Sequence, residues 1–166
     1  MVLGLSTPTF TVLHVIISLI GIAAGFVALS ALIRGIWLGR WTALFLIATV
    51  ATSVTGFFFH STAIDPPQIV GVISLFVLAL ALLAKYTHRL AGYWRLTFIV
   101  TAVIGQYLNV FVAVVQAFKK VPFLHLLAPK GSEPPFVATQ ALVLALFIAF
   151  GYLAAKGFRP ASVSTV

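Results

Sequence analysis

The chain contains no cysteine and very few charged residues. Without cysteine it can form no disulfide bond, thiolate metal site, iron–sulfur cluster or cysteine nucleophile. Charged residues make up 7% of the 166 residues and hydrophobic residues 62%, whereas soluble domains carry about 25% charged residues. A water-soluble fold has too little polar surface to enclose so many apolar side chains. The composition therefore predicts an integral membrane protein.

Acidic residues are the scarcest charged type, with two Asp and Glu against ten Lys and Arg and a net charge of +8. In a soluble protein such an excess would suggest a nucleic-acid partner. Here the basic residues lie between apolar runs, where the loops of membrane proteins concentrate Lys and Arg, and we expect no nucleic-acid partner. Neither acid falls inside an apolar run, which argues against proton-coupled transport through an intramembrane carboxylate.

Apolar runs recur along the chain, at residues 10–32, 41–59, 69–84, 96–118 and 136–155. Each is close to the about 20 residues that a helix needs to cross the membrane, and none alternates strictly as barrel strands do. We predict an all-α bundle of five transmembrane helices that forms one domain over residues 1–166. The third run is the shortest, so a merged or re-entrant arrangement there stays open. The first run is too long for a cleavable signal peptide and is expected to remain.

The basic residues between the five runs fall mainly on one side of the membrane. That side carries Arg34, Arg40, Lys85, Arg89, Arg95, Lys156 and Arg159, and the other carries Lys119, Lys120 and Lys130. The positive-inside rule then places the N-terminus outside and the C-terminus in the cytoplasm. Short loops make sequential helices antiparallel neighbours. The outer loop 119–135 holds an apolar segment between Pro122 and Pro129, which is either an interfacial helical turn or a plain connection.

Small and polar residues within the runs mark faces that meet other helices, a cavity or a partner. At about 100° per residue, Gln106, Asn109 and Gln116 share one face of the fourth helix. Three carboxamides are costly in hydrocarbon unless they are hydrogen-bonded, so this face should meet protein or water. The first helix carries Gly21 and Gly25 as a GxxxG pair, which permits close helix packing; Gly56 is a further packing candidate.

Polar residues of several helices fall at similar depths once the topology is applied. They form a candidate pocket that opens outward, lined by His14, Thr49, Thr52, Ser53, His60, Gln106, Asn109, Gln116 and Gln140. Buried polar sites in membrane proteins often serve function. Equally, these hydroxyls and amides could only hold the helices together.

Two cofactor hypotheses can be drawn from the histidines. His14 and His60 lie at compatible depths and could ligate one b-type haem. His60, Asp65, His125 and Glu133 are external and of metal-ligand type, but their spacing matches no metal motif. There is no GxSxG sequence and no phosphate-binding glycine loop. We therefore expect no catalytic residues and no obligatory cofactor.

Three segments carry a resemblance to known proteins: WTALFLIATVATSVTGFFF at residues 41–59, RLAGYWR at 89–95, and YLNVFVAVVQAFKKVPFLHLLAP with SEPPF over 107–136. With them the chain resembles a family of small bacterial inner-membrane proteins with no assigned function. The resemblance implies a bacterial inner-membrane location and gives no residue a role. Asn109, Gln116, Lys119, Pro122, His125 and Glu133 lie within these segments.

The sequence thus predicts a membrane protein that is surrounded by lipid, and it favours a non-enzymatic protein over an enzyme. It is expected to bind a small or lipid-like ligand, or a partner subunit, through the outward polar pocket. The partner could be another membrane protein or a second copy of the chain. Two alternatives stay open: a structural or accessory subunit of a larger membrane complex, and a haem or metal redox protein.

Overall fold

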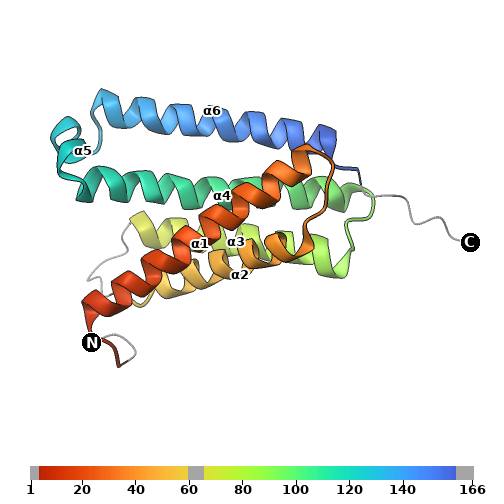
Figure 1. The fold of residues 1–166 in the computed structure, drawn as a ribbon, viewed down its shortest axis with the longest axis horizontal. Helices are drawn as coiled ribbons and strands as arrows, with labels where there is room; N and C mark the ends of the chain where they lie inside the picture. Colours follow the sequence, from red (N-terminus) through yellow and green to blue (C-terminus); the bar gives the residue numbers. More distant parts are fainter. Residues whose placement is uncertain (1–3, 60–65, 160–166) are drawn as a thin grey trace, which may run out of the picture.

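The computed structural model describes residues 4–59 and 66–159, and within these ranges the chain is all-α (Figure 1). Its elements are α1 (Thr7–Ile33), α2 (Gly39–Gly56), α3 (Pro66–Leu82), the π-helical turn η1 (Leu83–Thr87), α4 (Tyr93–Lys120), α5 (Pro122–Leu127) and α6 (Pro134–Gly157). Four of the described helices are long and apolar enough to cross a membrane: α1, α3 continued by η1, α4 and α6. They indicate an integral membrane protein.

The prediction of five spans is confirmed for four helices, and the weakest span is not the one that the sequence suggested. The third run gains length because η1 continues α3, giving an apolar helix over Gln68–Thr87. The doubtful span is instead α2, which has 18 residues and includes Arg40. It also carries the hydroxyl residues Thr42, Thr49, Thr52, Ser53 and Thr55. With these polar groups, α2 is not among the four helices whose length and hydropathy suit a membrane span.

Capping groups and proline set the ends of several helices. The Ser6 hydroxyl accepts a hydrogen bond from the Thr9 backbone N–H at 3.3 Å and so caps α1. α5 and α6 begin at Pro122 and Pro134, where proline's missing N–H costs nothing. After η1 the chain turns sharply, with positive φ at Arg89. Local signals therefore account for most of the boundaries.

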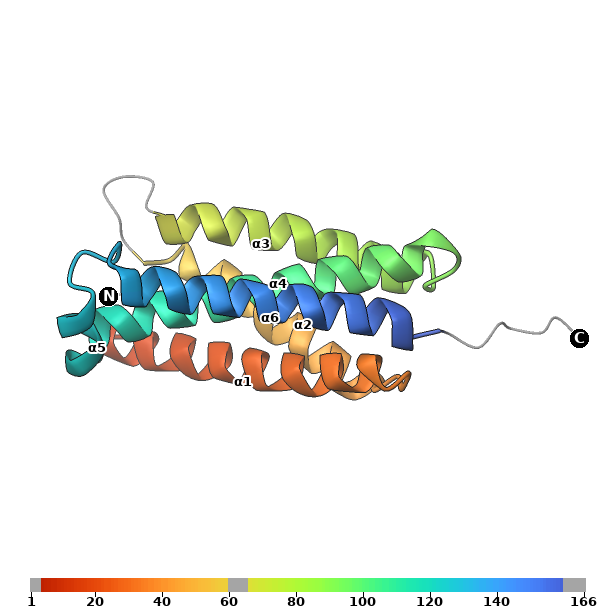
Figure 2. The same cartoon turned by 90° about the horizontal axis from the view of Figure 1, so that it is seen from above.

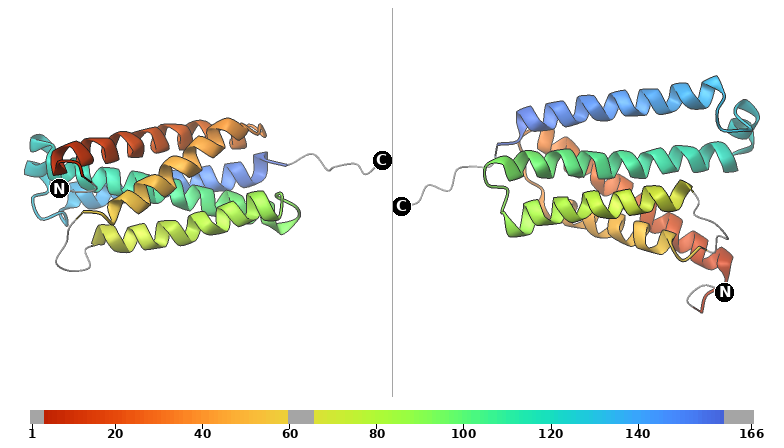
Figure 3. Two further views of the ribbon diagram at one scale, coloured as in Figure 1. Left: turned by 90° about the horizontal axis from the view of Figure 1, so that it is seen from below. Right: turned by 180° about the vertical axis from the view of Figure 1, so that it is seen from behind.

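The long helices pack with sequence neighbours side by side. α1 runs diagonally across the bundle in Figure 1 and lies along one edge of it when seen from above in Figure 2. α1 contacts α2, α6 and α4, while α4 also packs against α3 and α6. The start of α1, α5 and the start of α6 lie at one end of the bundle, and the end of α6 lies at the other (Figure 3). We call these the α5 end and the basic end, because the latter carries Arg34, Lys85, Arg95 and Lys156.

The core is tighter toward the basic end than toward the α5 end. Phe45, Leu46, Phe98 and Ile99 are buried there on α2 and α4. At the basic end itself, the Arg95 guanidinium donates hydrogen bonds to the backbone carbonyls of Ala155 and Phe158 and so caps α6. In contrast, every residue of α4 from 107 to 117 is only half-buried. The bundle therefore covers the half of α4 toward the α5 end less than the half toward the basic end.

Candidate functional site

Two carboxamides of α4 tie this helix to α1 and α2 near the middle of the bundle. The Gln106 Nε2 donates to the Ile22 carbonyl of α1 at 2.7 Å, and the Asn109 Nδ2 donates to the Thr49 Oγ1 of α2 at 2.9 Å. Gln106 and Thr49 are fully buried. This group of residues therefore joins three helices through polar contacts, which we call the central joint.

The GxxxG pair of α1, Gly21 and Gly25, packs against the central joint. A Cβ added at Gly25 would overlap the Gln106 carboxamide, and one added at Gly21 would lie 3.3 Å from the Ala48 Cβ. The two glycines therefore bring α1 close to α4 and α2 of the same chain. Gly56 is less constrained, because an added Cβ would lie 3.9 Å from the nearest atom of His14.

A second polar contact joins α1 and α2 closer to the α5 end. The His14 Nδ1 lies 2.7 Å from the Thr55 Oγ1, and the His14 ring packs edge-on against the Phe59 ring at 5.2 Å between centroids. The sequence reasoning missed Thr55, although it lies one turn from Thr52 on α2. His60, the proposed second ligand of a haem, lies outside the described residues, so the His14–His60 pair stays a prediction.

Gln140, a further predicted pocket residue, forms its hydrogen bond apart from the central joint and from the His14–Thr55 contact. The Gln140 Nε2 of α6 donates to the Phe111 carbonyl of α4 at 3.1 Å. The structure thus distributes the predicted pocket residues over three interhelical contacts: His14 with Thr55, the central joint, and Gln140 with Phe111. Ser53 lies one turn after Thr49 on α2 and is buried.

Several polar atoms have no hydrogen-bond partner within the described part of the chain. Thr52 Oγ1, Gln106 Oε1 and Gln140 Oε1 are buried in this way. The Gln106 oxygen is covered by the Gly25 backbone, since a Cβ there would overlap it. The burial of the unpaired Thr52 hydroxyl has no such explanation. A buried hydroxyl without a partner costs about 1–3 kcal/mol, so the Thr52 environment favours a further group, such as water or a ligand.

The polar face of α4 becomes more accessible toward the α5 end. Gln106 is fully buried, Asn109 and Gln116 are half-buried, and Lys120 is exposed. We call His14, Thr52, Asn109, Gln116 and Lys120 the polar seam. Its inner limit is the central joint, and its outer limit is the α5 end.

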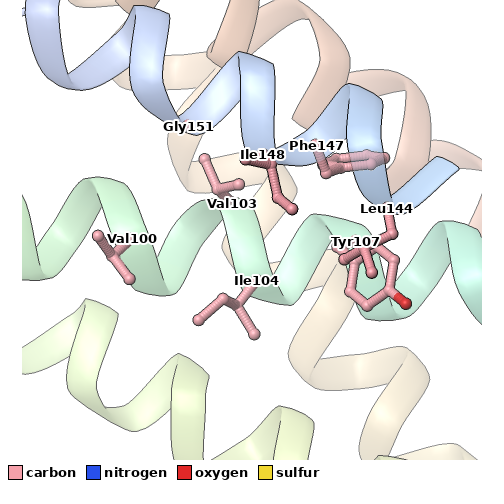
Figure 4. Close-up of a pocket in the computed structure, with 8 residues that line it drawn as sticks. All are labelled: Val100, Val103, Ile104, Tyr107, Leu144, Phe147, Ile148 and Gly151. Atoms are coloured by element: carbon pink, nitrogen blue, oxygen red, sulfur yellow. The ribbon is translucent and has the colours of Figure 1, made fainter. Parts of the chain in front are cut away.

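The concave feature of the surface between α4 and α6 is apolar and separate from the polar seam. It has a volume of about 170 Å³ and is lined by Val100, Val103, Ile104, Tyr107, Leu144, Phe147, Ile148 and Gly151 (Figure 4). Tyr107 is the one polar side chain among these eight residues. None of the predicted pocket residues lines this groove.

The predicted metal ligands are not brought together in the part of the chain that the structure describes, where no three His, Asp or Glu residues cluster. His125 is exposed on α5. The Glu133 carboxylate accepts the backbone N–H groups of Lys130 at 2.9 Å and Ser132 at 3.0 Å. These hydrogen bonds, that from Lys130 above all, hold the pKa of Glu133 below its usual value. His60 and Asp65 lie outside the described residues.

Comparisons of the chain with protein-family models, with curated proteins and with solved structures found no match. The structure therefore defines a class, a small all-α bundle with candidate membrane-spanning helices, and the comparisons identify no family within it.

Proposed function

We propose that the protein is a non-enzymatic membrane protein that binds a small or lipid-like ligand through the polar seam. The observation that carries the proposal is the unequal use of the amides on one face of α4. The amides of Gln106 and Asn109 already donate hydrogen bonds within the central joint. Gln116, two turns farther out, is half-buried and has no hydrogen-bond partner among the described residues. Gln116 lies one turn before Lys120 at the end of α4, so its unpaired amide is placed to bind a polar group from outside the chain.

The proposed membrane arrangement has five spans, with α2 as the fifth. Two observations support this, although α2 is not among the four helices whose length and hydropathy suit a membrane span. Its hydroxyls at Thr49 and Thr55 bond to Asn109 and His14, so these polar groups face protein instead of lipid. The unequal distribution of basic residues supports an outer N-terminus and a cytoplasmic C-terminus, and the resemblance described above favours a bacterial inner membrane.

Substitutions at two amides of the same helix face test the proposal. Native mass spectrometry of protein released from its own membranes should detect a retained small molecule in the wild type. Gln116→Leu should lose that molecule while keeping the wild-type melting temperature, because Gln116 has no hydrogen bond to another helix within residues 4–59 and 66–159. Asn109→Leu should also lose it, and it should lower the melting temperature slightly, because it breaks the hydrogen bond to the buried Thr49 hydroxyl, a bond worth about 0.6 kcal/mol on average within a membrane.

Gln106→Leu is the matched control, because this amide is fully buried against α1. It should lower the melting temperature and leave retention of the molecule in the surviving folded protein unchanged. Full retention in both Gln116→Leu and Asn109→Leu would exclude the polar seam as the binding site.

A second candidate function is that of an accessory subunit, and α6 favours it. Only 11% of its apolar window is buried within the bundle, and α6 forms one wall of the apolar groove. A stable hetero-oligomer in the same mass spectra, with no retained small molecule, would favour this function over ligand binding.

A further inference from the structure

The short helix α5 presents an apolar face that the rest of the chain does not cover. Its six residues are all exposed or half-buried. Phe123 is 69% exposed and Leu126 is 79% exposed, and Leu127 is exposed beside them. Positions i, i+3 and i+4 lie on one side of a helix, so these three side chains form one surface, which we call the α5 face.

α5 is held at a fixed place at the end of α4. The Val121 N–H donates to the Ala117 carbonyl at 2.9 Å, and the His125 N–H donates to the Val121 carbonyl at 2.9 Å. The backbone thus turns from α4 into α5 with its hydrogen bonds kept, and Figure 1 shows α5 at the end of the bundle, between α4 and α6. α5 packs against α4, while its apolar face is turned away.

The length of α4 places α5 at the boundary of the membrane. α4 has 28 residues, which corresponds to about 42 Å at about 1.5 Å per residue. The hydrocarbon core is only about 30 Å thick. The end of α4 therefore extends into the head-group region, and α5 follows it directly there.

The charges around the α5 face are basic. Lys119, Lys120 and Lys130 are exposed on both sides of it. The one acid of this loop, Glu133, is hydrogen-bonded to the loop backbone itself. Short helices with exposed Phe and Leu and with flanking Lys bind the interface of anionic membranes, with the apolar side chains about 5–10 Å below the head groups.

We propose that α5 is an interfacial anchor whose α5 face inserts into the lipid leaflet at this end of the bundle, with Lys119, Lys120 and Lys130 binding anionic phospholipid head groups. The proposal does not depend on a ligand in the polar seam. It gives the loop between α4 and α6 a function, because α5 would fix the depth of these two helices in the membrane. Of the four candidate spans, α6 is the one that the bundle buries least.

Site-directed spin labelling of the full chain can test this, because the chain has no native cysteine. Leu126→Cys reports on the α5 face, and Ser132→Cys, exposed in the same loop, is the matched control. In nanodiscs of phosphatidylcholine with phosphatidylglycerol, we expect the label at 126 to collide more with oxygen than with a water-soluble nickel chelate. The label at 132 should show the reverse.

Two further measurements separate lipid from other partners. Replacing phosphatidylglycerol by phosphatidylcholine, or introducing Lys119→Gln and Lys120→Gln together, should make the label at 126 at least severalfold more accessible to the nickel chelate. Equal nickel accessibility at 126 and 132 would overturn the anchor. A label at 126 that neither reagent reaches would mean that protein covers the α5 face, which would also overturn it. No response to the head-group charge would overturn the role of the lysines.

Discussion

Gly25→Ala places a methyl group where the structure has the carboxamide of Gln106. The added Cβ would overlap this carboxamide, and Gln106 is fully buried with its Nε2 bonded to the Ile22 carbonyl. The amide must therefore move, which breaks that bond. The lost bond costs about 0.6 kcal/mol, and an amide left buried without a partner costs about 1–3 kcal/mol. The better helix propensity of alanine offsets about 0.5–1 kcal/mol of this loss in unfolding free energy.

The net expectation for Gly25→Ala is a loss of about 1–3 kcal/mol of unfolding free energy, measured by steric trapping in bicelles. Gly56→Ala is the control, since its Cβ would make only an ordinary contact at 3.9 Å. It should be neutral or slightly stabilising. Native mass spectrometry should find the same oligomeric state for Gly25→Ala and wild type, because Gly25 packs within its own chain.

A double-mutant cycle identifies the atom group responsible. In a Gln106→Ala background the carboxamide is gone and the methyl group at position 25 has room, so Gly25→Ala should cost less than about 0.5 kcal/mol, the usual limit for independent sites. The same cost in both backgrounds would refute the reasoning, because the methyl group would then meet something other than the Gln106 amide.

Three further predictions concern topology, the outer loop and haem. Single cysteines replacing His88 and His125 should react with an impermeant reagent in intact cells only at 125; labelling at 88 and not at 125 would reverse the orientation. Because folding lowers the pKa of Glu133, its stabilisation of the loop is present above the ordinary glutamate pKa of about 4.3 and is lost as the pH falls through the lowered value. Protection of the Lys130 and Ser132 amides, measured as the ratio of intrinsic to observed exchange rate, should therefore fall only in acid, whereas Glu133→Gln should lower it at neutral pH as well. The optical spectrum of the purified protein should lack a Soret band; a band that disappears in His14→Ala would favour the haem hypothesis.

The limits of the helices could be read from the sequence to within a few residues, because they depend on local chemistry. Apolar runs end where charge, Pro or Gly begins, and Pro122 and Pro134 coincide with helix starts. The apolar segment between Pro122 and Pro129 is a helix, α5, as one of the two sequence interpretations proposed. The spacing of Gln106, Asn109 and Gln116 also defined a shared face without reference to any other helix.

The partners of those polar residues were decided only by the tertiary structure. Gln106 bonds to a backbone carbonyl of α1, and Asn109 to a hydroxyl of α2. A backbone acceptor has no signature in the sequence, and the choice among many threonines depends on how far each helix is shifted along its neighbours. The same shift brings Gly25 against Gln106. Helix periodicity determines which residues share a face, whereas the crossing of α1 over α2 and α4 determines what that face meets.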